Sequence, residues 1–179
     1  MSVPPNDSLM ISGIFLAGFA QSCVNLNIVA GQRATRLLAN YEFGAWYPYG
    51  QFRELQVNFF EAYSNGAPIL ERVGIEMMRA WYHFGPGKDI VKTGVDFLHF
   101  QTGSQGYASV VKGPVHEVGS FVLEDVNSER GYARILSTTP FDRDMERGVL
   151  IGGMSAPGDL DFVDVTYDRA SNCYIVEFH

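Results

Sequence analysis

The sequence predicts an α+β domain, in which a helical N-terminal part is followed by an antiparallel sheet with a long helix packed on one face. Two observations support this fold class. Apolar residues recur at helical spacing through residues 8–112, whereas residues 113–179 read as strand, strand, helix, strand, strand. We expect residues 1–7 to be a disordered leader and residues 8–179 to form one domain.

The first part of the chain gives the weaker helical patterns. Residues 10–19 place apolar side chains at helical spacing, but Gly13 and Gly18 weaken a helix there. An extended segment that leads into a helix is therefore an open alternative. A second helix is expected over residues 29–38, and the aromatic stretch 44–50 is expected to be a turn.

Three further helices follow, and the second of them is the clearest amphipathic helix in the chain. Residues 49–63 form the first, and residues 64–66 end it because Asn and Gly tolerate a left-handed C-cap. Pro68 suits the first turn of the next helix. That helix has an apolar stripe of Leu70, Val73, Gly74, Met77 and Trp81. Residues 85–87 break the pattern, and residues 89–100 are expected to be another helix.

Four strands are expected in the last third of the chain. Residues 116–126 contain enough β-branched and aromatic side chains for a strand, and residues 132–138 return as its hairpin partner. Residues 162–167 and 173–178 form a second hairpin. The two hairpins together predict one antiparallel sheet.

A long helix connects the two hairpins. Thr139 is expected to be its N-cap, with Pro140 at the first helical position and Asp142 near the positive end of the helix dipole. Three glycines lie inside it, each of which costs about 1 kcal/mol relative to alanine. We expect them to allow close packing of the helix against the sheet. They are Gly148, Gly152 and Gly153.

Composition excludes several classes of protein. The chain has 179 residues, a net charge of -7 and no run of Lys or Arg, so nucleic acid and anionic membrane surfaces are not expected partners. The apolar run 9–20 is too short to span a membrane. Cys23 and Cys173 lie far apart, which indicates free thiols and a cytoplasmic protein rather than a disulfide framework.

No motif for catalysis or metal binding stands out. Residues 85–88 lack the spacing of a phosphate loop, and Ser155 lacks the glycine that a nucleophile elbow needs. His83 and His99 lie near the ends of aromatic-rich helices, where an axial haem ligand could be placed, although a packed or capping role is the more common one. The late aspartates fit a solvated strand face better than a Ca²⁺ loop; they are Asp159, Asp161, Asp164 and Asp168.

Aromatic residues supply the candidate ligand-binding site. They make up 13% of the chain, and several of them fall on the predicted helices beside a methionine. Large rings and Met are typical linings of a pocket for an apolar ligand, but the same residues would also make an ordinary core. The candidate ligand-binding residues are Trp46, Phe52, Phe60, Met77, Trp81, Phe97 and Tyr107.

Four short stretches carry a resemblance to a known superfamily. The chain resembles the haem-NO-binding-like and vinyl-reductase-type (hydrocarbon-binding) ligand-binding domains, over about 130 residues. The stretches are Trp46-Tyr47-Pro48-Tyr49, Ile69-Leu70-Glu71-Arg72-Val73-Gly74, Thr138-Thr139-Pro140-Phe141 and Arg147-Gly148-Val149-Leu150-Ile151-Gly152-Gly153. The resemblance implies residues 8–179 as a single ligand-binding-like domain, a small-molecule sensor in signalling, often a homodimer, that holds a hydrophobic or tetrapyrrole-like ligand.

Two departures from the superfamily pattern bear on the cofactor. Haem-NO sensors carry a Tyr-x-Ser-x-Arg motif for the haem propionates, and no Tyr here begins that pattern. Vinyl-reductase-type domains often end with two cysteines, of which only Cys173 has a counterpart. The first hypothesis is therefore a stand-alone ligand-binding or sensory domain without catalysis. A tetrapyrrole-related reductase or accessory protein and a homodimeric structural or adaptor module are the alternatives.

Overall fold

The computed structural model describes residues 8–28, 36 and 40–179. The predicted leader at residues 1–7 and nearly all of the predicted helix at 29–38 lie outside the described residues. Within the described part of the chain, no helix is both long enough and apolar enough to cross a membrane.

In the described part of the chain, the N-terminal layer packs the helices α1 (Gly13–Asn25) and α3 (Tyr49–Ala62) beside a small sheet. The strands of this sheet are β1 (Met10–Ser12), β2 (Trp46–Pro48) and β3 (Val111–Lys112), in the order β2-β1-β3 with antiparallel pairing. The extended alternative for the first segment is thus correct for β1. The turn predicted at 44–50 is wrong at Trp46–Pro48, because β1 offers this segment a pairing partner that local sequence does not reveal.

Of the helices predicted after α3, one is confirmed and one is divided in two. Helix α4 (Ala67–Phe84) confirms the amphipathic prediction. The single helix predicted over 89–100 is wrong, since the chain forms α5 (Gly87–Ile90) and then α6 (Gly94–Thr102). The break comes from a capping box, in which the Thr93 hydroxyl accepts from the Asp96 amide and the Asp96 carboxylate accepts from the Thr93 amide.

The strand predicted from residue 116 begins later than expected. A 3-10 turn, η1 (Tyr107–Ser109), leads to β3, and a helical turn, α7 (Val115–Val118), follows it. Gly119 then adopts a φ of 72°, a conformation that suits glycine and ends the turn. Only after this reversal does β4 (Phe121–Asn127) start.

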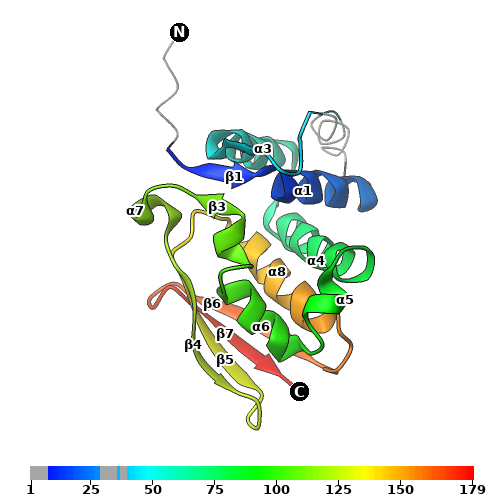
Figure 1. The fold of residues 1–179 in the computed structure, drawn as a ribbon, viewed down its shortest axis with the longest axis vertical. Helices are drawn as coiled ribbons and strands as arrows, with labels where there is room; N and C mark the ends of the chain where they lie inside the picture. Colours follow the sequence, from blue (N-terminus) through cyan, green and yellow to red (C-terminus); the bar gives the residue numbers. More distant parts are fainter. Residues whose placement is uncertain (1–7, 29–35, 37–39) are drawn as a thin grey trace.

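The C-terminal sheet confirms the predicted strand, strand, helix, strand, strand order. Its strands are β4, β5 (Tyr132–Ser137), β6 (Val163–Asp168) and β7 (Cys173–Phe178), paired antiparallel in the order β4-β5-β7-β6. Helix α8 (Arg143–Ser155) connects the two hairpins. Figure 1 shows α8 and α6 on one face of this sheet, with α1 and α3 above them at the far side of α4.

Helix α8 begins three residues later than predicted. Its N-cap is Asp142, whose Oδ1 accepts from the amides of Asp144 and Met145 at 2.9 and 3.1 Å. Thr139 is not the cap, because its hydroxyl bonds to a carboxylate further along α8. Residues 139–141 therefore lie in a linker between β5 and α8, which bends at Pro140 and Phe141.

The glycines of α8 allow close packing, but against helices rather than the sheet. A Cβ on Gly148 would overlap the carbonyl oxygen of Glu71, and one on Gly152 would lie 2.7 Å from the Cα of Ile75, both residues of α4. The ring of Phe97 on α6 occupies the space beside Gly153. The prediction that these glycines pack against the sheet is wrong, because the face of α8 on which they lie contacts α4 and α6.

One arginine joins α4, α8 and β6. Arg147 on α8 forms an ion pair with Glu71 on α4, and its Nη2 lies 3.3 Å from Oδ1 of Asp164 on β6. Its Nε donates to the backbone carbonyl of Val165. The guanidinium thereby ties the outer strand of the sheet to the helical layer.

Candidate functional site

A cluster of aromatic rings joins the N-terminal layer to the linker before α8. We call this cluster the aromatic seam. Its rings come from α1, α3, η1, β4 and the linker, and most of them are buried. Its members are Phe15, Phe19, Tyr49, Phe52, Tyr107, Phe121 and Phe141.

Phe141 is the centre of the seam. Its ring stacks on Phe15 with a centroid distance of 4.8 Å. It meets Phe52 and Tyr107 at 5.7 and 5.6 Å in edge-on geometry, and Tyr49 at 5.9 Å. Such ring pairs are worth about 0.5–1.5 kcal/mol each beyond the area they bury. Phe15 is only partly buried, so the seam reaches solvent at this ring.

The linker that carries Phe141 is fixed by hydrogen bonds on both sides. The Tyr49 hydroxyl donates to the Pro140 carbonyl at 3.0 Å, which connects α3 to the linker. The Phe141 amide donates to Oγ1 of Thr139 at 3.4 Å. A displacement of the linker backbone at Phe141 would therefore disturb the hydrogen bonds of Tyr49 and Thr139 as well.

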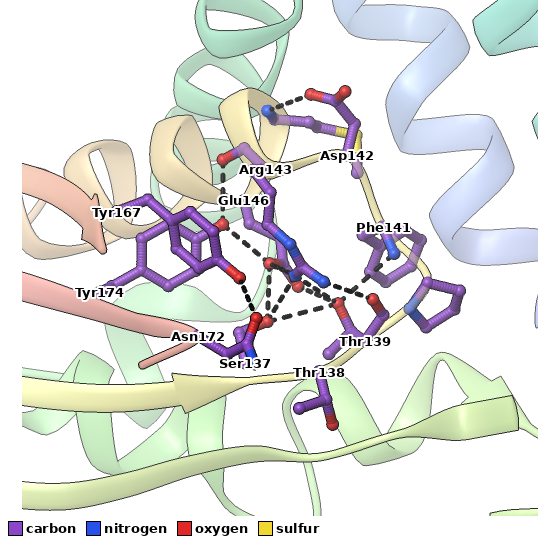
Figure 2. A network of polar contacts seen from close by, with 12 residues as sticks. Ser137, Thr138, Thr139, Phe141, Asp142, Arg143, Glu146, Tyr167, Asn172 and Tyr174 are labelled. Atoms are coloured by element: carbon purple, nitrogen blue, oxygen red, sulfur yellow. Dashed lines mark hydrogen bonds and ion pairs between the residues drawn. The ribbon is translucent and has the colours of Figure 1, made fainter. Parts of the chain in front are cut away.

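A buried carboxylate lies next to the seam. Glu146 on α8 has only 6% of its side chain exposed. Its Oε2 accepts from Ser137 Oγ, Arg143 Nη1 and Tyr174 Oη at 2.8, 2.6 and 2.8 Å, and its Oε1 accepts from Thr139. Figure 2 shows these four donors converging on the carboxylate from β5, the linker, α8 and β7. We call them the carboxylate cradle.

Arg143 connects the cradle to the surface. Its side chain is 31% exposed, and its Nη2 donates to the Thr139 carbonyl at 2.7 Å. The guanidinium carbon lies 5.3 Å from the ring centre of Tyr167, within the range of a cation–π contact. The Tyr167 hydroxyl in turn donates to Asn172 at 3.1 Å. The cradle is thus sealed on its outer side by an arginine that packs on a tyrosine.

Burial dominates the titration of these groups. It raises the pKa of the Glu146 carboxyl above its ordinary value, more than Arg143 and the hydroxyl donors lower it. The pKa of Tyr174 is raised by burial and then by the Glu146 charge. Burial first, and the Glu146 charge among the further causes, also raises the pKa of Tyr49 and of Tyr107. The two seam phenols are therefore within electrostatic reach of Glu146.

The raised pKa of Glu146 predicts a pH dependence of stability. The folded state holds this proton more tightly than the unfolded state, so the contribution is complete below pH 4.5 and is lost as pH rises through the folded pKa. The stability of the wild type relative to Glu146→Gln should therefore decline from acid to neutral pH. Urea unfolding of both proteins across this range measures it. If the stability of the wild type relative to Glu146→Gln instead rises toward neutral pH, the prediction is wrong. Such a rise would mean that Arg143 and the hydroxyl donors lower the Glu146 pKa more than burial raises it.

The structure places two of the sequence-predicted site residues in the seam. Phe52 is fully buried on α3, and Tyr107 is 6% exposed on η1. Both rings meet the ring of Phe141 edge-on. The pair is the part of the candidate site that the fold brings together around one centre.

The other five candidates lie elsewhere. Trp81 and Phe97 form a second cluster between α4 and α6, with centroids 6.2 Å apart. Met77 is buried on α4, where its Cε lies close to Gly18 of α1. Trp46 carries Lys112 Nζ over its ring at 4.1 Å, and Phe60 is 47% exposed on α3.

Sequence reasoning missed Phe15, Tyr49, Phe141 and Glu146 as site residues. A local signal existed for the first two, because Phe15 and Phe19 are four residues apart and Tyr49 and Phe52 three apart, so each pair shares a helix face. Phe141 lies on the linker, and its partners are about 90 or more residues earlier on α1 and α3. No helical periodicity can show that contact.

The seam is closed in this structure. Two solvent-open grooves, of about 520 and 910 Å³, are lined by no seam residue, although the smaller one runs along other residues of α3. Among the described residues, no group of three or more His, Cys, Asp or Glu side chains is arranged to hold a metal ion. A ligand in the seam would have to separate rings that touch one another here.

Comparison with known proteins defines the fold. No family model and no curated protein sequence matches this chain. The solved structure of a single-substitution variant of Tt H-NOX superposes with a TM-score of 0.63 at 12% identity, and the match covers 94% of this chain and 95% of that one. The chain therefore has a haem-NO-binding-like fold, as the sequence resemblance predicted.

The residues of this chain do not fit haem. His83 and His99, the candidate axial ligands, are both exposed, and the other two histidines, His116 and His179, are exposed as well. Cys23 is buried, and burial raises the pKa of its thiol to about 12, which disfavours the thiolate that binds iron. The Tyr, Ser and Arg side chains that meet in the carboxylate cradle are already bound to Glu146.

Proposed function

We propose that this chain is a small-molecule-binding domain with a sensory role, which takes an apolar ligand between the rings of the aromatic seam. One observation carries the proposal: Phe141, on a short linker, is held by four rings from three other segments. Aromatic walls with few polar groups are the usual lining of sites for apolar ligands. The haem-NO-binding-like fold supports a ligand-binding role without naming the ligand.

Ligand entry would change the linker. Phe15 is the partly exposed ring, so the seam opens most easily between α1 and Phe141. A ligand there displaces Phe141, and the linker carries that displacement to the Tyr49 hydrogen bond and to Thr139 in the carboxylate cradle. Binding is in this way reported at the start of α8. The structure shows the closed form, in which the rings of the seam touch. The apparent affinity for a ligand is therefore the affinity of the open form multiplied by the fraction of molecules that are open.

Removing the central ring should therefore strengthen binding. N-phenylnaphthylamine, an uncharged probe that fluoresces in apolar sites, is titrated into delipidated protein. We expect saturable binding to the wild type and tighter binding to Phe141→Ala, since the ring no longer has to move. Phe60→Ala is the matched control, because Phe60 is a half-exposed ring outside the seam. Its affinity should equal that of the wild type.

Phe141→Ala could unfold the protein, so the experiment includes a milder variant and a test of folding. Phe→Ala changes in a core cost about 3–5 kcal/mol, so Phe141→Leu is measured beside Phe141→Ala. Cooperative thermal unfolding of each variant confirms that the probe is binding a folded protein. The proposal is wrong if folded wild type does not bind the probe, or if Phe60→Ala alters the affinity and the Phe141 variants do not.

Four predictions from the sequence do not depend on the aromatic seam. A homodimer, a role in signalling, a tetrapyrrole-related reductase and the lack of catalysis all stay predictions. Light scattering of the purified chain tests the first of them directly.

A further inference from the structure

We propose that Glu146 determines the class of ligand: the seam takes uncharged apolar molecules and rejects carboxylic acids, because the carboxylate-binding groups beside it already hold the carboxylate of the chain itself. The inference rests on the proposed function and names the chemistry of its ligand. Glu146 acts here as a specificity-determining residue.

The cradle has the chemistry of a carboxylate-binding site. One guanidinium and three hydroxyls donate to the two oxygens of Glu146. Charged and hydroxyl donors of this kind are those that proteins use for carboxylates, and a carboxylate has about four lone-pair sites to fill. Since Glu146 occupies all four donors, they are not available to a ligand while it stays in place.

The cradle and the seam share the linker. Thr139 donates to Glu146, and two residues later Phe141 is the centre of the seam. The Glu146 charge contributes to the raised pKa of Tyr49 and of Tyr107, whose rings both contact Phe141. A charged group among these rings would therefore interact with Glu146 through a poorly solvated interior.

Charge balance decides which ligands are accepted. Within the described part of the chain, Glu146 has one cationic partner, Arg143, so the pair is neutral. Arg53 lies 5.5 Å from the ring centre of Tyr49, but it is exposed to solvent on α3. A second carboxylate in the seam would be an uncompensated negative charge next to Glu146, and like charges placed together cost several kcal/mol. An alcohol of the same length brings no such penalty.

A matched pair of ligands tests the inference. Decanol and decanoate have the same chain, and at about pH 7.5 the acid is ionised. Each competes with N-phenylnaphthylamine, and the ratio of the two affinities is measured in wild type, Glu146→Gln and Glu124→Gln. The last variant removes the same charge from the open face of the sheet. We expect the preference for decanol to fall about tenfold or more in Glu146→Gln, which frees Arg143, and to be unchanged in Glu124→Gln.

Each outcome has a distinct meaning. An unchanged ratio in Glu146→Gln overturns the inference and leaves the proposed function standing. Failure of decanol and decanoate alike to displace the probe from wild type overturns the proposed function itself, and the inference with it. Should Glu146→Gln not fold, Glu146→Leu replaces it, because it removes the same charge without adding a buried amide. The preference for decanol must again fall, and an unchanged ratio would overturn the inference.

Discussion

Replacing Gly148 by alanine is expected to destabilise the protein by about 1–3 kcal/mol, although alanine is the better helix former. The added Cβ would overlap the Glu71 carbonyl, which belongs to the backbone of α4 and cannot turn aside. The two helices would have to separate along their contact, and the Arg147–Glu71 ion pair would be strained. Urea unfolding of the purified variant measures the loss.

Gly18→Ala is the matched control for this prediction. Gly18 also lies inside a helix, α1, but a Cβ there would meet only the Met77 Cε at 3.8 Å, an ordinary contact. The gain in helix propensity should therefore appear in full, up to about 1 kcal/mol. Equal effects of the two substitutions would contradict the close approach of α4 and α8.

Replacing Glu146 by alanine is expected to cost about 3–5 kcal/mol, the usual effect of removing one partner from a buried ion pair. The change leaves Arg143 without its carboxylate and takes away the carboxylate oxygen that accepts from the buried Ser137 hydroxyl, whereas the Tyr174 hydroxyl keeps the Arg143 carbonyl at 2.9 Å as an acceptor. Chemical unfolding at neutral pH, with circular dichroism to confirm the fold, gives the value.

Glu124→Ala provides the comparison at the surface. Glu124 pairs with Arg134 at 2.9 Å, but the side chains are 38% and 41% exposed, so the loss should be at most about 1 kcal/mol. A similar loss for Glu146→Ala would mean that the carboxylate cradle contributes little to stability. The contrast compares a buried carboxylate, held by an arginine and three hydroxyls, with an exposed one that is paired with an arginine.

Local patterns were sufficient for the elements that depend on local interactions. The stripe on α4 and the two hairpins follow from periodicity and turn residues, and the structure confirms them. Local patterns did not give the correct start of α8. Thr139 and Pro140 satisfy the rules for a helix start, but the helix begins three residues later. The Thr139 hydroxyl is instead bonded to Glu146, and Asp142 takes over the cap. A cap that is in use elsewhere cannot be recognised from sequence.

The candidate site was predictable only in part, because contacts between segments distant in sequence decide which residues belong to it. Phe52 and Tyr107 were chosen because they are large and apolar, and they do meet around Phe141. Size alone gave no ground to separate them from Phe60, which the fold leaves half-exposed. Glu146 gave no signal, since a lone glutamate on a helix is normally a surface residue. Its burial depends on donors from three other segments that only the folded chain brings together.

The position of Arg147 has a consequence for how copies of this protein behave at high concentration. Strand β6 is an outer strand of the four-stranded sheet, and outer strands offer backbone groups to which a foreign strand can add. At Val165 the carbonyl is already engaged by the Arg147 side chain. At the opposite margin, β4 is interrupted by a bulge between Leu123 and Asp125. Each margin of the sheet thus has one feature that opposes the addition of a further strand at that position.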